Sequence, residues 1–541
     1  MSREVDKNAK ETMLIGVNMV ADPVASTLGA QGKLVTISTK DQTVPDGQGG
    51  YKIVRGKAIT TKDGVTVAKA VTSDEPRTEA GIRMIKEVAE KTVEEVGDGT
   101  SGSTILARYM MNEGVKAINE GVNHVDYCNG IQEAVKAVTE KVKELSRPVD
   151  SQELATKIAT ISANNDAELG SLIGEVFGQI GLNGAVSIEE GTEFETTFDV
   201  VKGMAISSGY TTHHFINTYK GECVLENPII VLFSGEVNTV NEITNVLGKS
   251  MQAKRPLLLI ADIQNEALET VIVNRERGAL DVCIVKPPSM GSTRDDLMRD
   301  ISAVTGVEYI TKAQGRKFSE IEPNLNGGAA KVIVSKNDTK IVGGFGTEEQ
   351  LAQRKEELEE NLKQSKNKKW FKSRISMLEG GVARIIVGGK TTSDMKERYD
   401  RVEDAVLATQ SAAEEGYVAG GGSTFRHIAL NEKKAFNASG YNPDFIKGYN
   451  LVLEACLEPE KTILKNAGQV HEETFLDRLF PPKQTEQQEY GYGFDAKEYE
   501  TKVDLISRGI IDPTKVLDRC LRNASTNAIT LLKTDFLIFD K

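Results

Sequence analysis

The stretch Val96-Gly97-Asp98-Gly99-Thr100-Ser101-Gly102-Ser103-Thr104 places three glycines, four hydroxyl side chains and one acid within nine residues. Glycine lacks a Cβ and adopts positive φ, so the backbone here can approach a ligand closely. Backbone N–H groups at a helix start bind anions, and a carboxylate beside them can hold the Mg²⁺ that accompanies a nucleotide. The stretch therefore predicts a Mg-nucleotide cradle, with a plain glycine-rich turn between two helices as the alternative.

Two common phosphate-binding motifs do not explain this stretch. Gly97-x-Gly99-x-x-Gly102 spells the dinucleotide fingerprint, which requires a preceding strand. The apolar residues upstream recur instead at helical spacing, namely Ile82, Ile85, Val88, Ala89, Val93 and Val96. A helix is expected to enter the loop, which argues against a dinucleotide-dependent enzyme. The Gly-Lys-Ser/Thr sequences at 248–250 and 389–391 lack the earlier glycine that the Walker loop needs.

Composition limits the class of protein. A chain of 541 residues is too long for one core, so several domains are expected. The 66 basic and 79 acidic residues give a net charge of −13, which argues against broad nucleic-acid binding. The five cysteines are scattered, without a Cys-x-x-Cys, and fit a reducing compartment, here taken as the cytoplasm. The start lacks the apolar core of a secretion signal, and no apolar run is long enough for a membrane span.

The periodicity of apolar residues changes along the chain. Residues 10–30 predict a helix, and residues 33–71 predict β structure in which Asp63-Gly64 forms a hairpin turn. Further helices are expected up to Arg147-Pro148, because the residue before proline disfavours the α region.

The middle of the chain reads as an α/β unit. Apolar strands alternate with helices, which favours a partly parallel sheet; these strands are 229–233, 257–261 and 282–285. Later segments predict a hairpin at 331–342, charged helices at 347–378, a strand at 382–387, an exposed loop at 471–495 and a proline-marked helix start at 509–514.

The small-residue turns form an ordered set along the chain. Its members are Thr27-Leu28-Gly29, Thr61-Lys62-Asp63-Gly64, Gly97-Asp98-Gly99-Thr100, Val402-Glu403-Asp404, Val418-Ala419-Gly420-Gly421-Gly422 and Ile511-Asp512-Pro513-Thr514. In this order and at these spacings, the set resembles the group I chaperonins, the GroEL-like family, over nearly the whole chain. Each motif is weak alone, and six in register are specific.

This resemblance implies a multidomain fold with both α and α/β parts, in a ring oligomer. A mainly helical equatorial ATPase domain would comprise residues 1–144 and 415–541, and a small α/β intermediate domain residues 145–201 and 383–414. An α/β apical domain at 202–382 would bind substrate. The implied partners are unfolded polypeptides, further copies of the chain in a ring of about seven subunits, and a GroES-type co-chaperonin, with no nucleic acid and no membrane.

The resemblance also assigns roles around ATP. Asp98 would ligate Mg²⁺, with K⁺ as a candidate second ion, and the catalytic residues Asp63 and Asp404 would position or activate the attacking water. The remaining nucleotide-binding positions are Thr27, Leu28, Gly29, Ala30, Lys62, Gly99, Thr100, Ser101, Gly102, Gly421, Asp495 and Asp512. The implied function is ATP-driven folding of non-native chains, with an ATP hydrolase coupled to it.

Apolar apical residues would capture non-native chains, because exposed apolar surface is common to unfolded proteins. The matching positions are Tyr210, Phe215, Leu247, Leu268, Ile272 and Val273. Ordinary helix core is the alternative interpretation of Leu268, Ile272 and Val273.

Several positions depart from the family pattern. His214 stands where the family has an aromatic residue and Thr244 where it has leucine, which makes the binding surface more polar. Ala30, Gln31 and Gly102 replace a proline, a lysine and a threonine in the nucleotide loops. These three changes motivate an alternative function, a ring-shaped holdase with weak or lost ATPase. The 41–57 and 471–490 segments also differ, which leaves the ring number open.

Overall fold

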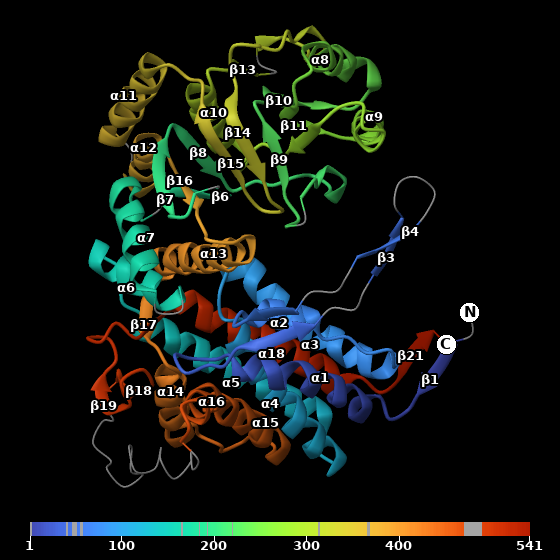
Figure 1. The fold of residues 1–541 in the computed structure, drawn as a ribbon, viewed down its shortest axis with the longest axis vertical. Helices are drawn as coiled ribbons and strands as arrows, with labels where there is room; N and C mark the ends of the chain where they lie inside the picture. The colour runs from blue at the N-terminus through green and yellow to red at the C-terminus, as the bar shows by residue number, and fades with distance from the viewer. Residues whose placement is uncertain are drawn as a thin grey trace. The chain divides into compact units, whose positions relative to one another are not determined.

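The computed structural model describes residues 3–38, 42–45, 51–54, 58–163, 166–182, 184–191, 193–218, 220–311, 314–364, 368–469 and 490–540. It contains two compact units (Figure 1): unit 1 is Met1–Gly174 with Thr392–Lys541, and unit 2 is Glu175–Thr391. Both boundaries fall inside the segments predicted as an intermediate domain, so the three-domain division stays a prediction. Among the helices described, none combines the length and apolar character needed to cross a bilayer.

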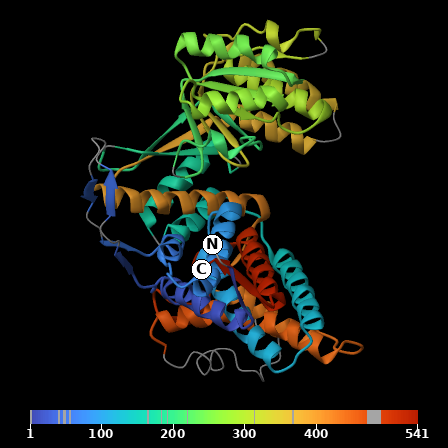
Figure 2. The ribbon, with the colours of Figure 1, turned by 90° about the vertical axis from the view of Figure 1, so that its right-hand side faces the viewer.

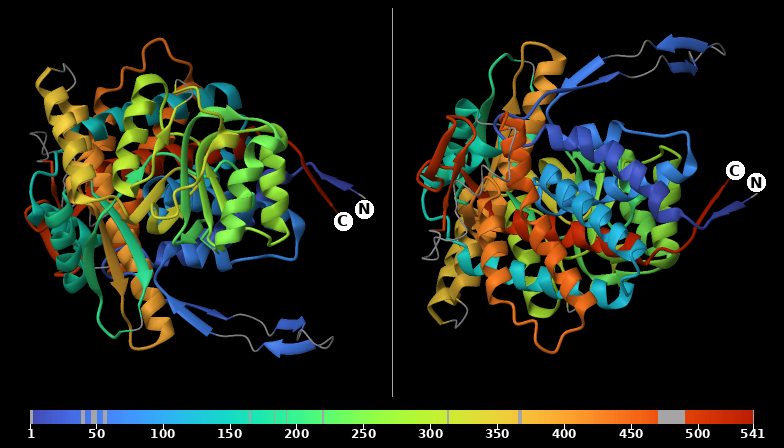
Figure 3. Two further views of the ribbon diagram at one scale, coloured as in Figure 1. Left: turned by 90° about the horizontal axis from the view of Figure 1, so that it is seen from above. Right: turned by 90° about the horizontal axis from the view of Figure 1, so that it is seen from below.

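Unit 1 is a helical assembly built from both ends of the chain. Its main helices are α1 (Ala9–Ser26), α3 (Pro76–Val96), α4 (Thr100–Asn119), α5 (His124–Leu145), α15 (Pro443–Ala455) and α18 (Thr514–Lys533). The predicted apolar stripes form its core, in which Ile82, Ile85 and Val88 of α3 are fully buried. The ends meet where β1 (Arg3–Asp6) pairs antiparallel with β21 (Leu537–Asp540), and the two termini lie side by side in each view (Figures 2 and 3).

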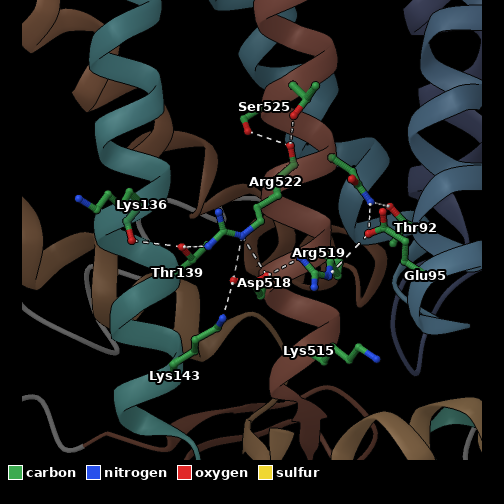
Figure 4. A network of polar contacts seen from close by, with 12 residues as sticks. Thr92, Glu95, Lys136, Thr139, Lys143, Lys515, Asp518, Arg519, Arg522 and Ser525 are labelled. Carbon is green, nitrogen blue, oxygen red and sulfur yellow. Dashed lines mark hydrogen bonds and ion pairs between the residues drawn. The ribbon is translucent and has the colours of Figure 1, made fainter. Parts of the chain in front are cut away.

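A polar network fixes α18 against its neighbours (Figure 4). The Asp518 side chain is 1% exposed and accepts hydrogen bonds from Arg522 Nε at 3.0 and 3.1 Å. Arg519 and Lys143 also place nitrogens 3.4 and 3.7 Å from its carboxylate. Arg522 further donates to Thr139 Oγ1 of α5 at 2.8 Å. A buried carboxylate is tolerated only when it is paired, so these contacts fix how α18 faces the rest of unit 1.

Only part of residues 33–71, which were predicted to be β-rich, forms strands. β2 (Val35–Ser38) pairs with β5 (Ala58–Thr61), and β3 (Gln42–Pro45) pairs with β4 (Tyr51–Val54). Val65 and Val67 instead lie in a short helix, α2 (Gly64–Ala70). The Asp63 carboxylate caps this helix by accepting from Val65 N at 3.2 Å and Thr66 N at 2.7 Å. The predicted hairpin turn at Asp63-Gly64 is therefore wrong, because an N-cap aspartate satisfies the first helical N–H groups.

Unit 2 contains the expected parallel sheet. Its order is β12 (Val282–Val285), β11 (Leu257–Ile263), β10 (Ile229–Val237) and β13 (Tyr309–Ile310), with every neighbouring pair parallel. The connecting helices are α8 (Val240–Ala253), α9 (Asn265–Glu276) and α10 (Gly291–Thr305). A second, antiparallel sheet has the order β8 (Gly203–Ile206), β15 (Thr339–Gly344), β14 (Ala329–Val334) and β9 (Cys223–Glu226). β14 and β15 form the predicted hairpin.

Shorter elements complete the two units. In unit 2, β16 (Val382–Val387) lies between β6 (Ala185–Glu190) and β7 (Thr197–Val201). The charged segment predicted at 347–378 forms α11 (Glu348–Gln364) and α12 (Lys368–Gly380). In unit 1, the elements that reach the site described below are α6 (Gln152–Ser162), α13 (Thr392–Glu415), β17 (Tyr417–Ala419), α14 (Ser423–Ala435), α16 (Glu458–Asn466), β18 (Tyr492–Asp495), β19 (Glu500–Asp504) and β20 (Ile511–Pro513). Most of the predicted 471–495 loop lies outside the described residues, and its last four residues form β18.

Candidate functional site

A cavity of about 580 Å³ lies within unit 1. Segments far apart in the chain form its wall: the loop after α1, the start of α2, the α3–α4 turn, the middle of α13 and the ends of β17, β18 and β20. It is lined by every residue that the sequence assigned to nucleotide binding or catalysis, namely Thr27, Leu28, Gly29, Ala30, Lys62, Asp63, Asp98, Gly99, Thr100, Ser101, Gly102, Asp404, Gly421, Asp495 and Asp512. The fold thus brings residues of the six separate segments to one place, although Val402-Glu403-Asp404 lies within helix α13 and is not a turn.

The α3–α4 turn depends on its glycines. Gly97 and Gly99 have φ of 74° and 87°, in the left-handed region that side chains disfavour. A Cβ on Gly99 would also lie 2.5 Å from Cys520 Sγ and 2.7 Å from Val516 Cγ1 of α18. Because α4 begins at Thr100, its first N–H groups have no partner within the helix. The helix start therefore offers donors and a partial positive charge to an anion in the cavity.

The carboxylates that line the cavity repel one another. The pKa of Asp404 is raised well above its usual value by burial and by the charges of Asp98 and Asp63. Burial and then Asp98 raise the pKa of Asp512 to about 7. The pKa of Asp98 is raised by burial and by Asp63, against hydrogen bonds from Gly99 N and Ser162 Oγ. A bound cation would relieve this crowding, because an opposite charge favours the ionised form.

The donor set fits a hard cation that arrives with a nucleotide. Over the residues that the structure describes, no group of three or more His, Cys, Asp or Glu side chains could hold a metal ion. Mg²⁺ is usually held by one or two carboxylates together with phosphate oxygens and waters. Lys62, whose Nζ lies 3.5 Å from the Ala30 carbonyl, has a pKa lowered by burial, and a phosphate would supply its counter-charge.

Some cavity residues were missed from the sequence. Ser162, at the end of α6, donates its hydroxyl to Asp98 Oδ2 at 3.2 Å. Nothing in the spacing of the residues around Ser162 indicates that its side chain faces Asp98. Cys520 Sγ donates to the Gly99 carbonyl at 3.2 Å, and Arg401 on α13 pairs with Asp166 at 3.0 Å. These contacts depend on tertiary packing, so a single sequence carries no signal for them.

The six predicted polypeptide-binding residues all lie in unit 2, but they differ in exposure. Val273 is 41% exposed, and Tyr210, Leu268 and Ile272 are partly buried. Phe215 and Leu247 are 0% and 6% exposed and belong to the core. Both side chains are therefore buried in this conformation, and their assignment to polypeptide binding stays a prediction. The short helix His213–Phe215 turns the Phe215 ring inward, and α8 buries its apolar stripe, which includes Leu247.

His214 and Thr244, the two polar departures from the family pattern, also lie in unit 2. His214 Nδ1 is 2.8 Å from Glu276 Oε1 at the end of α9. The Thr244 hydroxyl donates to the Val240 carbonyl within α8 at 2.7 Å and is exposed.

Comparison with known proteins gives a consistent result. The sequence profile of the TCP-1/cpn60 chaperonin family matches residues 20–541. Among solved structures, the chain is similar to the chaperonin gp146 from the bacteriophage EL 2 (Pseudomonas aeruginosa), which was crystallised in the presence of ATP-BeFx. One crystal form matches with a TM-score of 0.71 at 22% identity, covering 100% of both chains. A second form matches with a TM-score of 0.62 at 22% identity, covering 100% of this chain and 99% of the other.

The structural likeness extends over the whole chain and confirms the predicted fold class, a multidomain chaperonin fold with helical and α/β parts. The family match includes all six segments and leaves out only residues 1–19. The chain belongs to the TCP-1/cpn60 chaperonin family.

Proposed function

We propose that this protein is an ATP-driven chaperonin that hydrolyses Mg-ATP in the unit 1 cavity and binds non-native polypeptides on apolar surface of unit 2. The observation that carries the proposal is the cavity itself. It combines a helix N-terminus built on left-handed glycines with several mutually repelling carboxylates. An anion site and a cation site side by side fit a metal-bound triphosphate.

Each part of the cavity has a separate task in this proposal. The N–H groups at the start of α4 hold phosphate oxygens, and Asp98, oriented by Ser162, holds Mg²⁺. The ion would neutralise charge on the phosphates when it is bound. Asp404 and Asp63 orient the attacking water and accept its proton. Asp63 is held by its capping bonds to α2, which keep the carboxylate in place.

The proposal includes a homo-oligomeric ring, of about seven subunits, in the cytoplasm. A GroES-type lid and K⁺ dependence are further parts of it that rest on the family resemblance alone. The candidates for polypeptide binding with accessible surface are Val273, which is exposed, and Tyr210, Leu268 and Ile272, which are partly buried.

Steady-state phosphate release from the full-length protein tests the role of Asp404. Asp404→Asn keeps the shape of the side chain but removes its base, so turnover should fall by about 10²–10⁴-fold while ATP binding is retained. The matched control is Asp394→Asn, an acid on the same helix that does not line the cavity. Equal turnover in Asp404→Asn and wild type would refute the assigned role. If the wild type itself releases no phosphate yet suppresses aggregation of an unfolded protein, the holdase alternative is correct.

A further inference from the structure

Tyr490, two residues before β18, bonds the end of another strand in the cavity wall. Its hydroxyl accepts a hydrogen bond from the backbone N–H of Ala419 at 3.0 Å, although the two residues are 71 positions apart. Ala419 is the last residue of β17 and is 0% exposed. A buried N–H without a partner is costly, because it cannot bond to water instead. Tyr490 therefore supplies the partner that the last N–H of β17 requires.

The other side of β17 pairs with β20. The strands are antiparallel, with Ala419 opposite Ile511. The next residue, Gly420, donates its N–H to the Ile510 carbonyl at 2.9 Å. Successive N–H groups along a strand point to opposite sides, so the Ala419 N–H points away from β20. On that side, the Tyr490 hydroxyl takes the place of a neighbouring strand.

Helix α14 holds the same strand end and the tyrosine ring. Thr424, which is 0% exposed, donates from Oγ1 to the Ala419 carbonyl at 2.6 Å, and the same oxygen lies 3.5 Å from the Tyr490 hydroxyl. The Tyr490 ring meets His427 edge to face, with ring centroids 5.5 Å apart. Burial raises the pKa of Tyr490, so its hydroxyl stays neutral near pH 7. Both backbone groups of Ala419 are thus bonded by side-chain hydroxyls.

The strand end that Tyr490 holds leads directly into the cavity. Gly421 and Gly422, which follow Ala419 closely, have φ of 65° and 78° and line the cavity. Glycines contribute no side chain, so this part of the wall is backbone alone, and the strand before it sets its position. A shift of β17 would move this backbone and, through the pairing with β20, the Asp512 that also lines the cavity.

Tyr490 also precedes a second part of the wall. β18 begins two residues later, and its last two residues, Phe494 and Asp495, line the cavity. The Tyr490 hydroxyl therefore ties β18 to the β17–β20 pair. Three cavity segments that are distant in the sequence depend on this one bond for their mutual placement.

These segments form a part of the wall that is separate from the anion site. In the proposed function, the phosphates lie at the start of α4 with Asp98 and Asp404. The nucleoside then lies against the remaining wall. There Phe494 offers an apolar face, and the oxygens of Asp495 and Asp512 offer acceptors for hydroxyl or amino groups.

We propose that Tyr490 is a positioning residue that sets the nucleoside end of the cavity by bonding the Ala419 N–H. Tyr490 does not itself line the cavity, so it acts through β17 and β18. The inference rests on the proposed function, because it takes the ligand to be a nucleotide. Since the phosphate and water positions depend on α2, α4 and α13, loss of the hydroxyl should weaken nucleotide binding without slowing hydrolysis.

The test compares full-length wild type with Tyr490→Phe, which removes the hydroxyl and keeps the ring. The KM for ATP should rise by about 5–20-fold, because the Ala419 N–H loses its partner, while kcat stays within about twofold of the wild-type value. Direct titration should show ATP and ADP weakened by the same factor, since both carry the same nucleoside. Tyr492→Phe is the matched control, because it deletes the same group two residues later, and its KM should equal that of the wild type.

A second variant tests the same strand end through its carbonyl group. Thr424→Val removes the hydroxyl that bonds the Ala419 carbonyl, so it should also raise KM. Both substitutions free the same strand end, so together they should raise KM by less than the product of their separate factors.

A merely structural role for Tyr490 predicts a different pattern, in which the melting temperature and kcat fall through loss of folded protein while KM is unchanged. That pattern overturns the proposal, as does an ATP affinity that changes without an equal change for ADP. If the wild type binds ATP without hydrolysing it, the titrations with the two nucleotides decide. A wild type that binds neither nucleotide overturns the proposed function and this inference with it. A wild type that binds both, with Tyr490→Phe binding them equally well, overturns this inference alone.

Discussion

Replacing Gly99 with alanine should destabilise unit 1 even when no nucleotide is present. The φ of 87° disfavours any Cβ by about 1–2 kcal/mol. The new atom would also lie 2.5 Å from Cys520 Sγ and 2.7 Å from Val516 Cγ1, and overpacking of this kind costs about 1–3 kcal/mol. The combined loss is about 2–5 kcal/mol. At about 2 °C per kcal/mol for a large unit, the melting temperature should fall by about 4–10 °C.

Gly102→Ala is the matched control, because it adds the same methyl group three residues later, in the first turn of α4. A Cβ there meets only Cys520 Sγ, at 4.0 Å, in ordinary contact. Since Gly102 lies inside α4, alanine should leave stability unchanged or raise it by up to about 1 kcal/mol. Thermal unfolding without nucleotide measures both variants.

A double variant separates the two terms for Gly99. Cys520→Ala removes the sulfur that the new Cβ would meet, so the pair Gly99→Ala/Cys520→Ala should recover part of the packing cost and none of the φ cost. The reasoning is refuted if Gly99→Ala melts with the wild type, or if the cysteine change makes no difference to its cost.

Three further variants test charges in unit 1. The pKa of Asp512 is about 7 in the native state and about 3.9 in the unfolded state. The native state therefore holds the extra proton, and the free energy of unfolding should fall by at most about 1.4 kcal/mol per pH unit as the pH rises from 4 to 7. In urea titrations without nucleotide, Asp512→Asn should flatten this slope. Arg426→Met should lower the free energy of unfolding by about 3–5 kcal/mol, because Glu460 is only 2% exposed and would lose the Arg426 Nε that lies 2.6 Å from its carboxylate. Adding Glu460→Leu should restore most of this loss. Asp518→Ala should lower the urea midpoint more than a surface change such as Glu140→Ala, because it removes the acceptor for Arg522 and the counter-charge of Arg519 and Lys143; equal midpoints would contradict this.

The sequence predicted those features that local patterning controls. Helical spacing identified α3 as the element entering the Gly97–Gly102 loop, and alternation of strands and helices identified the parallel sheet of unit 2. Errors arose where one pattern supports two structures. Val65 and Val67 suit a strand by propensity, but the Asp63 cap starts a helix there.

Exposure was predicted less well than secondary structure. Apolar side chains at helical spacing line either a core or a binding surface, and the spacing does not say which neighbours cover them. Leu247 of α8 is covered, whereas Val273 of α9 is not. The hydrogen bond from Ser162 to Asp98 joins residues 64 positions apart, and no local rule anticipates it.

The departures in the nucleotide loop bear on whether ATP hydrolysis is retained. Gly102, where the family pattern has threonine, removes a side chain from the start of α4, and Cys520 of α18 places its sulfur beside the same turn, bonded to the Gly99 carbonyl at 3.2 Å. Glycine in place of threonine at position 102 removes one hydroxyl group but keeps the backbone N–H. The anion site depends on N–H groups and the helix start, which a glycine supplies as well as a threonine does. Ala30 likewise keeps its carbonyl near Lys62 Nζ. The replacements at Gly102 and Ala30 therefore change side chains and leave the backbone groups of the cradle in place, so these two positions alone do not imply a lost ATPase.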